Sequence, residues 1–220
     1  MSSNDDESRL PKERPGQPGG KRDLNRRKRV AQLREAGLRL FLAHGVERVT
    51  IDDIAREAGT AKGNFYRYFD DKSDLIAGII EPARDILLDA LDQCEAALES
   101  AHDEPTLFAA YQTLAVALAP LAFGEGDVIR LYLQESRAPE VGASAPIRAL
   151  ADVIRLRAIE LTAYAVDKGL LHIRDPRISA LAVIGATEQL SWSLLNGDLD
   201  ASPAEIGGTL ISLVLSGIQS

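Results

Sequence analysis

The sequence predicts an all-α protein of about nine helices, in which the three N-terminal helices form a small domain of their own. Apolar residues recur at intervals of three and four over most of the chain. Residues that begin and end helices punctuate these stretches, and we find neither the alternation typical of strands nor an internal repeat. The 220 residues suffice for one or two domains with a full core. We therefore divide the chain into a tail (1–22), a small domain (23–72) and a helical body (73–220).

Residues 1–22 are rich in proline, glycine and charge, and Leu10 is their only sizeable apolar residue after Met1. Such a segment buries too little surface to offset its ordering entropy, so we expect disorder. A first helix then runs from about Arg26 to His44. Its inner stripe is Leu33, Ala36, Gly37, Leu40, Phe41 and His44. A cation at the C-terminus suits the helix dipole, so His44 is interpreted as structural rather than as a metal ligand or catalyst.

The segment 50–72 predicts two short helices joined by a tight turn. Thr50 and Asp53 have the spacing of a capping box, and Ile51, Ile54, Ala55 and Ala58 form one apolar face. Gly59 supplies the positive φ of a sharp helix end. A second helix is expected from Lys62 to Phe69, with Phe65 and Phe69 facing inward. This arrangement is a helix-turn-helix, whose second helix can enter a DNA major groove.

The exposed side chains of this segment have the chemistry that DNA binding requires. Lys62 can donate to guanine and Asn64 can pair with adenine, while Gly63 lets backbones approach closely. Hydroxyl or charged groups for phosphates come from Thr50, Thr60, Tyr66, Tyr68 and Lys72. Basic residues at the start of the first helix leave two interpretations open, a solvated first turn or an arm in the minor groove. They are Lys21, Arg22, Arg26, Arg27, Lys28 and Arg29.

The small domain resembles the DNA-binding domain of the TetR/AcrR family of transcriptional regulators. The resemblance rests on Phe41 to Gly45, the run Thr50 to Ala55, Ala58-Gly59, Lys62 to Phe69, and Lys72 followed by Leu75. It covers roughly fifty residues, and Phe65 and Arg67 depart from the residues most common in the family. The resemblance implies DNA contacts from Thr50, Thr60, Ala61, Lys62, Gly63, Asn64, Tyr66, Arg67, Tyr68 and Lys72.

The charge distribution agrees with this assignment. The chain carries a net charge of −8. Residues 1–72 hold sixteen Lys and Arg against twelve Asp and Glu, a net +4, whereas residues 73–220 hold nine against twenty-one, a net −12. A basic head can approach phosphates while an acidic body is repelled from them.

A long fourth helix is expected to begin with Ser73 as its cap and to be kinked or broken at Pro82. Its apolar stripe runs from Leu75 to Leu98, and Asp85, Asp89, Asp92, Glu95 and Glu99 form a solvated acidic face. Five further helices are predicted. They span about 104–119, 127–137, 147–168, 176–195 and 203 onward, with a loop at 139–146.

The last two helices are apolar on more than one face, which predicts a homodimer interface. The alternative is that both faces are filled within one chain. The resemblance implies a four-helix bundle with a twofold mate. The expected interface residues are Leu181, Gly185, Trp192, Ile206, Leu210, Leu213 and Val214, with Ala182, Ala186, Gly207, Gly208 and Gly217 permitting close approach.

The resemblance also implies a small-molecule effector in the body, at a site that no family motif identifies. Candidates are Cys94, Phe108, Tyr111, Phe123, Arg130, Tyr132, Tyr164 and Trp192. If Arg130 or Arg137 points inward, it needs an anionic partner, either a ligand carboxylate or an acid such as Glu135.

Other functional classes are disfavoured. Phosphate-binding, dinucleotide-binding and zinc-protease motifs are lacking, which argues against an enzyme, a cofactor or a metal site. Cys94 is the only cysteine, and neither a secretory signal nor an eighteen-residue apolar run is found, so we expect a cytoplasmic protein without a membrane span. The predicted function is a homodimeric repressor on a palindromic operator, released by a small molecule. The alternative is a regulator controlled by a protein partner, or an activator.

Overall fold

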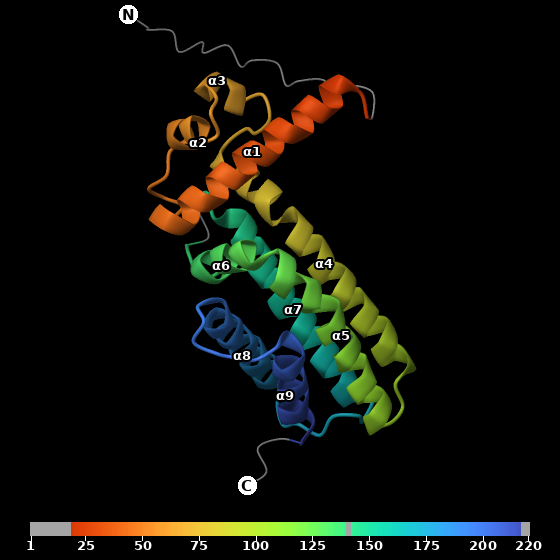
Figure 1. The fold of residues 1–220 in the computed structure, drawn as a ribbon. Helices are drawn as coiled ribbons and strands as arrows, with labels where there is room; N and C mark the ends of the chain where they lie inside the picture. The colour runs from red at the N-terminus through yellow and green to blue at the C-terminus, as the bar shows by residue number, and fades with distance from the viewer. Residues whose placement is uncertain (1–18, 140–141, 217–220) are drawn as a thin grey trace, which may run out of the picture. The chain divides into compact units, whose positions relative to one another are not determined.

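The computed structural model describes residues 19–139 and 142–216, apart from the side chains of 122–123 and 214–216. The described residues form nine α-helices and no strand, which confirms the all-α prediction (Figure 1). The helices are α1 (Lys21–His44), α2 (Ile51–Glu57), α3 (Lys62–Phe65), α4 (Lys72–Ser100), α5 (Glu104–Gly124), α6 (Gly126–Glu135), α7 (Ala145–Asp167), α8 (Pro176–Leu195) and α9 (Pro203–Ser216).

The chain divides into two compact units. The first extends to Ile79 and includes the loop 139–146, and the second comprises 80–138 and the residues from Ile147 onward. The division therefore falls inside α4, beyond the boundary after residue 72 that the sequence suggests. Helix α4 contributes residues to both units.

Helix α1 begins earlier than predicted because Asp23 organises its first turn. The carboxylate of Asp23 accepts a hydrogen bond from the Gly19 amide at 3.0 Å and pairs with Arg27 at 3.1 Å. These contacts, led by the Gly19 bond, lower the pKa of Asp23. Lys21 and Arg22, placed in the tail by the sequence, are thus helical. The disorder expected for residues 1–18 lies outside the described residues.

The core of the first unit is formed by the predicted inner faces of four helices. Leu33, Ala36 and Phe41 of α1 are fully buried, as are Ile54, Phe65, Leu75 and Ile76. Gly37 allows α1 to lie close to α4, since a Cβ there would lie 2.7 Å from Cδ2 of Leu75, whose side chain would have to shift. His44 ends α1 and is exposed, so its expected place in the inner stripe was wrong.

The start of α4 corrects one prediction. The cap is Asp71 rather than Ser73, because the Asp71 carboxylate accepts the Asp74 amide at 2.8 Å while Asp74 accepts the Asp70 amide at 2.9 Å. Lys72 is therefore the first helical residue. Pro82 does not break the helix, which continues to Ser100.

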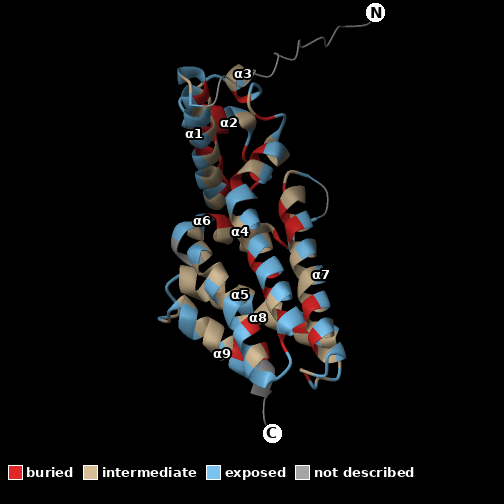
Figure 2. Cartoon of the chain, turned by 90° about the vertical axis from the view of Figure 1, so that its right-hand side faces the viewer, coloured by how far each residue is buried: buried red, intermediate tan, exposed pale blue. Residues whose placement is uncertain are grey.

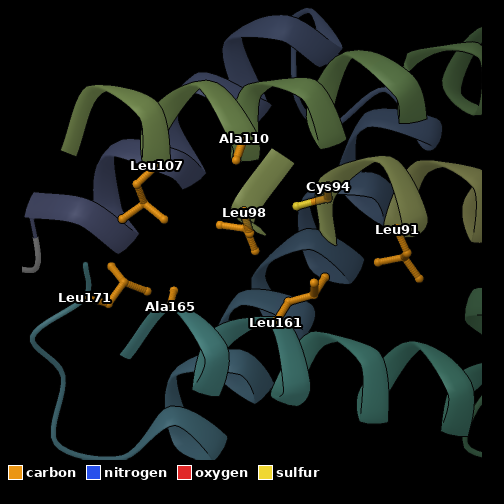
Figure 3. Close-up of a cluster of buried hydrophobic side chains, with 8 residues drawn as sticks. All are labelled: Leu91, Cys94, Leu98, Leu107, Ala110, Leu161, Ala165 and Leu171. Carbon is orange, nitrogen blue, oxygen red and sulfur yellow. The ribbon is translucent and has the colours of Figure 1, made fainter. Parts of the chain in front are cut away.

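In the second unit, α4, α5 and α7 enclose a buried apolar cluster (Figure 3). It consists of Leu91, Cys94, Leu98, Leu107, Ala110, Leu161, Ala165 and Leu171. The predicted acidic side of α4 is exposed (Figure 2). Arg157 of α7 pairs there with Asp92 at 2.8 Å and with Glu95 at 2.9 Å.

Local capping signals locate the helix starts of the second unit. Asp103 and Thr106 form a capping box for α5, Asp175 caps α8, and Ser202 pairs with Glu205 before α9. Helix α5 runs past its predicted end, through Pro120 to Gly124, while α6 ends two residues before the expected Arg137.

Lys168 closes the C-terminal end of α4. Its ammonium group donates to the carbonyls of Leu98, Glu99 and Ala101 at 3.1, 2.6 and 3.1 Å. These carbonyls lie at and just beyond the last turn of α4, so Lys168 fixes the end of α4 to the end of α7.

Helix α8 is apolar but poorly covered within one chain. By length and composition alone it could cross a membrane, and only 6% of its apolar stretch is buried. Its Glu188, however, is paired within the second unit, with Tyr132 and Arg137.

Candidate nucleic-acid interface

The helix-turn-helix of the first unit forms as its sequence predicts. The Thr50 hydroxyl accepts the Asp53 amide at 3.2 Å, and the Asp53 carboxylate accepts the Thr50 amide at 3.1 Å, which completes the capping box of α2. Gly59 has φ +64, and the Thr60 amide donates to the Ala55 carbonyl at 2.9 Å, so the chain turns sharply into α3.

Two phenylalanines fix the second helix to the core. Phe65 and Phe69 are buried, with ring centroids 5.7 Å apart, and the Tyr66 ring meets Phe65 edge-on at 5.6 Å. Inward phenylalanines leave the intervening side chains directed away from the core.

Helix α3 is shorter than predicted. It ends at Phe65 rather than Phe69, and Tyr66 to Tyr68 form a turn in which the amides of Tyr68 and Phe69 both donate to the Phe65 carbonyl. The helix that presents Lys62 and Asn64 is thus only four residues long.

The predicted base-contacting residues lie together on α3. Lys62, Tyr66 and Arg67 are exposed, and Gly63, Asn64 and Tyr68 are partly exposed. Lys62 pairs with Asp52 at 3.3 Å, and the Asn64 amide donates to the Thr60 hydroxyl at 2.7 Å. Both side chains therefore have partners within the chain, and their contacts with DNA bases stay a prediction.

Two predicted phosphate contacts also serve the fold. The Thr50 hydroxyl lies 2.6 Å from the Asp53 carboxylate, and the Lys72 ammonium donates to the Val46 carbonyl at 2.8 Å. The role of these two residues in phosphate binding stays a prediction, as do those of Thr60 and Ala61. The basic residues Lys21 to Arg29 lie on α1, so the structure presents them from a helix.

The candidate effector residues of the second unit have different surroundings. Cys94 is in the buried cluster and Tyr111 packs against it, and burial raises the pKa of both, that of Cys94 to about 11. Phe108 and Tyr164 are 37% and 38% exposed. Trp192 is partly buried. The side chain of Phe123, like that of Val214, lies outside the described residues.

The arginines of this region are held by protein groups. Arg130 pairs with Asp127 at 3.4 Å and donates to the Leu195 carbonyl. Arg137 pairs with Glu188 at 2.7 Å, and the Tyr132 hydroxyl donates to the same carboxylate at 3.1 Å. Burial first, and then the charge of Glu188, raises the pKa of Tyr132.

Two acidic residues with specific partners were missed by the sequence reasoning. Asp52 lies beside Lys62, and its partner could be found only from the packing of α2 against α3. Glu188 did carry a sequence signal, because a single acid in an otherwise apolar helix requires a hydrogen-bonding or charged partner.

An all-α protein that presents Lys62 and Asn64 on a helix-turn-helix is a DNA-binding protein by class. Residues 33–79 match the model of the bacterial regulatory proteins of the tetR family. The HTH-type transcriptional repressor BepR of Brucella suis is 31% identical over 154 residues, which cover 67% of this chain and 68% of that protein. The chain belongs to the TetR family of transcriptional regulators.

Other similarities concern parts of the chain or its fold. The regulator YvdT of Bacillus subtilis is 35% identical over 72 residues, only 36% of its length. A putative fatty acid metabolism regulator of Clostridium perfringens is 20% identical, with a TM-score of 0.66 over 86% of this chain and 99% of that one. MbdR of Azoarcus has the same score and identity, over 87% and 100%. These structures share the fold.

Proposed function

We propose that this protein is a homodimeric transcriptional repressor that binds a palindromic operator and is released by a small molecule. The observation that carries the proposal is the group of exposed and partly exposed side chains between Lys62 and Tyr68, anchored from beneath by the buried Phe65 and Phe69. A rigid support with projecting donors is what base recognition in a major groove requires.

The dimer would form through α8 and α9. Leu181 is 45% and Leu213 is 50% exposed, and a Cβ built on Gly185 or Gly208 meets no described atom within 4 Å. Not all of the proposed surface is open, because a Cβ built on Gly207 would lie 3.0 Å from the Cβ of Ala115 in α5. One side of α9 is thus covered within the chain, and the other side is available to a partner subunit.

Twofold symmetry would place two recognition helices on successive major grooves of one face of DNA, which explains the expectation of a palindromic operator. The relative BepR is named a repressor, which favours repression over activation. Binding to the chromosome requires residence in the cytoplasm.

The effector is proposed to bind in the second unit and to favour one of two conformations of the dimer. A ligand shifts such an equilibrium only by its difference in affinity for the two states. A structural neighbour, FadR of Bacillus subtilis, was solved with stearoyl-CoA, so acyl-CoA thioesters are the first compounds to test here.

The decisive experiment combines light scattering with selection from randomised DNA duplexes. A dimer that enriches an inverted repeat supports the proposal, and a protein that enriches no sequence contradicts it. Adding stearoyl-CoA or shorter acyl-CoA thioesters to the selected complex then tests release. Retention of DNA with every small molecule, combined with release by a protein from lysate, would favour the alternative of a protein partner.

A further inference from the structure

An ion pair connects the two helices of the helix-turn-helix at their exposed ends. Oδ2 of Asp52, in the first turn of α2, lies 3.3 Å from Nζ of Lys62, the first residue of α3. The two side chains are 58% and 53% exposed. Both charged groups are therefore accessible to a bound DNA molecule.

Asp52 is not needed to form α2. The neighbouring Asp53 makes the capping box with Thr50 and also pairs with Arg56. These hydrogen bonds lower the pKa of Asp53, the Thr50 side chain contributing most. Since Asp53 fulfils the capping role, the carboxylate of Asp52 is left for Lys62.

The pair presents a donor beside an acceptor. In the major groove, guanine offers the O6 and N7 acceptors that a lysine binds, and cytosine offers an N4 amine that can donate to a carboxylate. A G·C pair carries both groups side by side. A phosphate offers only acceptors and negative charge, so Asp52 opposes its approach to Lys62.

We propose that Asp52 is a specificity-determining residue, which acts with Lys62 to select a G·C pair and to weaken binding to phosphates elsewhere. The proposal rests on the proposed DNA-binding function. It accounts for an acidic residue beside a lysine on the surface that would meet DNA, where simple attraction would favour a neutral or basic side chain.

The test compares selection from randomised duplexes by the wild type, Lys62→Met and Asp52→Asn. Lys62→Met identifies the base pair that Lys62 contacts. Asp52→Asn is expected to lose G·C preference at that same base pair. The affinity of Asp52→Asn for a random-sequence duplex should rise about two- to fivefold for each subunit that contacts the DNA. This factor corresponds to the free energy of an exposed ion pair.

Glu57→Gln is the matched control, because Glu57 is another acid of α2 and pairs with Arg39 at 3.0 Å rather than with α3. It should leave selection unchanged. Asp52→Ala should act like Asp52→Asn, and thermal unfolding confirms that each variant is folded.

Unchanged G·C preference in Asp52→Asn would overturn the proposal while leaving the DNA-binding function intact. The proposal would also be overturned if Asp52→Asn lost base preference at a different base pair from the one at which Lys62→Met loses it. A wild-type protein that enriches no sequence would reject the proposed function, and this inference with it.

Discussion

The ammonium group of Lys72 donates a hydrogen bond to the backbone carbonyl of Val46 across 2.8 Å. Val46 follows the end of α1 and is 1% exposed, and Lys72 is the first residue of α4. The bond therefore joins the segment that precedes α2 to the segment that follows α3. Lys72 contributes to the fold of the first unit as well as being a candidate phosphate contact.

Replacement of Lys72 by alanine should have two separable effects. Loss of a phosphate contact should weaken binding to all DNA sequences alike and make the slope of log affinity against log salt shallower by about 0.9 per subunit. Loss of the charged donor to Val46 should lower the free energy of unfolding by about 1–3 kcal/mol. Fluorescence anisotropy over a salt series, well below the unfolding temperature, measures the first effect. Lys168→Ala is the control, since Lys168 also binds backbone carbonyls but lies in the second unit. If the slope is equal for Lys72→Ala and the wild type, Lys72 makes no phosphate contact.

Replacement of Asn64 by alanine should relax base preference at one position of the operator half-site. The expected cost on the selected operator is about 1–3 kcal/mol, with little change on random DNA. Selection from randomised duplexes measures both. Gln93→Ala, which removes an exposed amide from α4, should keep the wild-type preference. If Asn64→Ala selects the same half-site with the same strength, Asn64 does not contact a base.

A glutamate at Leu213 should convert the proposed dimer into monomers. Leu213 is 50% exposed in the single chain, so the change disturbs a partner surface more than the core. Light scattering over a concentration series measures the mass. Leu156→Glu is the control, because Leu156 is 56% exposed on α7, outside the proposed interface. Should Leu213→Glu remain dimeric, α9 does not form the interface.

Removal of the Glu188 carboxylate should destabilise the second unit. Its side chain is 15% exposed and serves both Tyr132 and Arg137, so Glu188→Ala should lower the free energy of unfolding by about 1–3 kcal/mol. Arg137→Ala should cost less, since the Arg137 side chain is 73% exposed. Urea unfolding measures both, with Gln189→Ala as the control on an exposed position of α8. Equal costs for all three variants would show that the pairing does not stabilise the fold.

Stability should fall in alkali because Cys94 is buried. Burial raises the pKa of its thiol from 9.0 to about 11. A raised native pKa means that the unfolded chain releases the proton first, so the contribution is complete below pH 9 and is lost as the pH rises towards 11. We expect the free energy of unfolding to fall by on the order of 1–2 kcal/mol between pH 7 and pH 10.5, and to fall less in Cys94→Ala. Urea unfolding at pH 7, 9 and 10.5 tests this, and an identical pH dependence in both proteins would contradict it.

Features set by neighbouring residues in the sequence were the most predictable. The capping boxes at Thr50 and Ser202 involve groups three residues apart, and both are present as expected. The end of α3 was not predictable in this way, because α3 ends at Phe65 although Phe65 and Phe69 keep the spacing of one helical face. The start of α4 does join groups three residues apart, Asp71 and Asp74, but two adjacent acids, Asp70 and Asp71, precede the serine that was expected to cap the helix.

In the candidate site, too, some features follow from the spacing of residues in the sequence and others depend on packing. Exposure of Lys62 and partial exposure of Asn64 followed from the spacing of the inward phenylalanines. Their partners Asp52 and Thr60 depend on how α2 and α3 pack, which spacing alone does not specify. Likewise, the pairing of Arg137 with Glu188 joins residues that are far apart in the sequence.

Pro82 lacks an amide hydrogen, so it cannot donate the helical hydrogen bond that the Gly78 carbonyl would otherwise receive from this position. It lies close to the division between Ile79 and Ile80, in the stretch of α4 where the chain passes from one unit to the other. One fewer backbone hydrogen bond lowers the cost of bending α4 at this turn. The helix can therefore bend here without losing its continuity to Ser100.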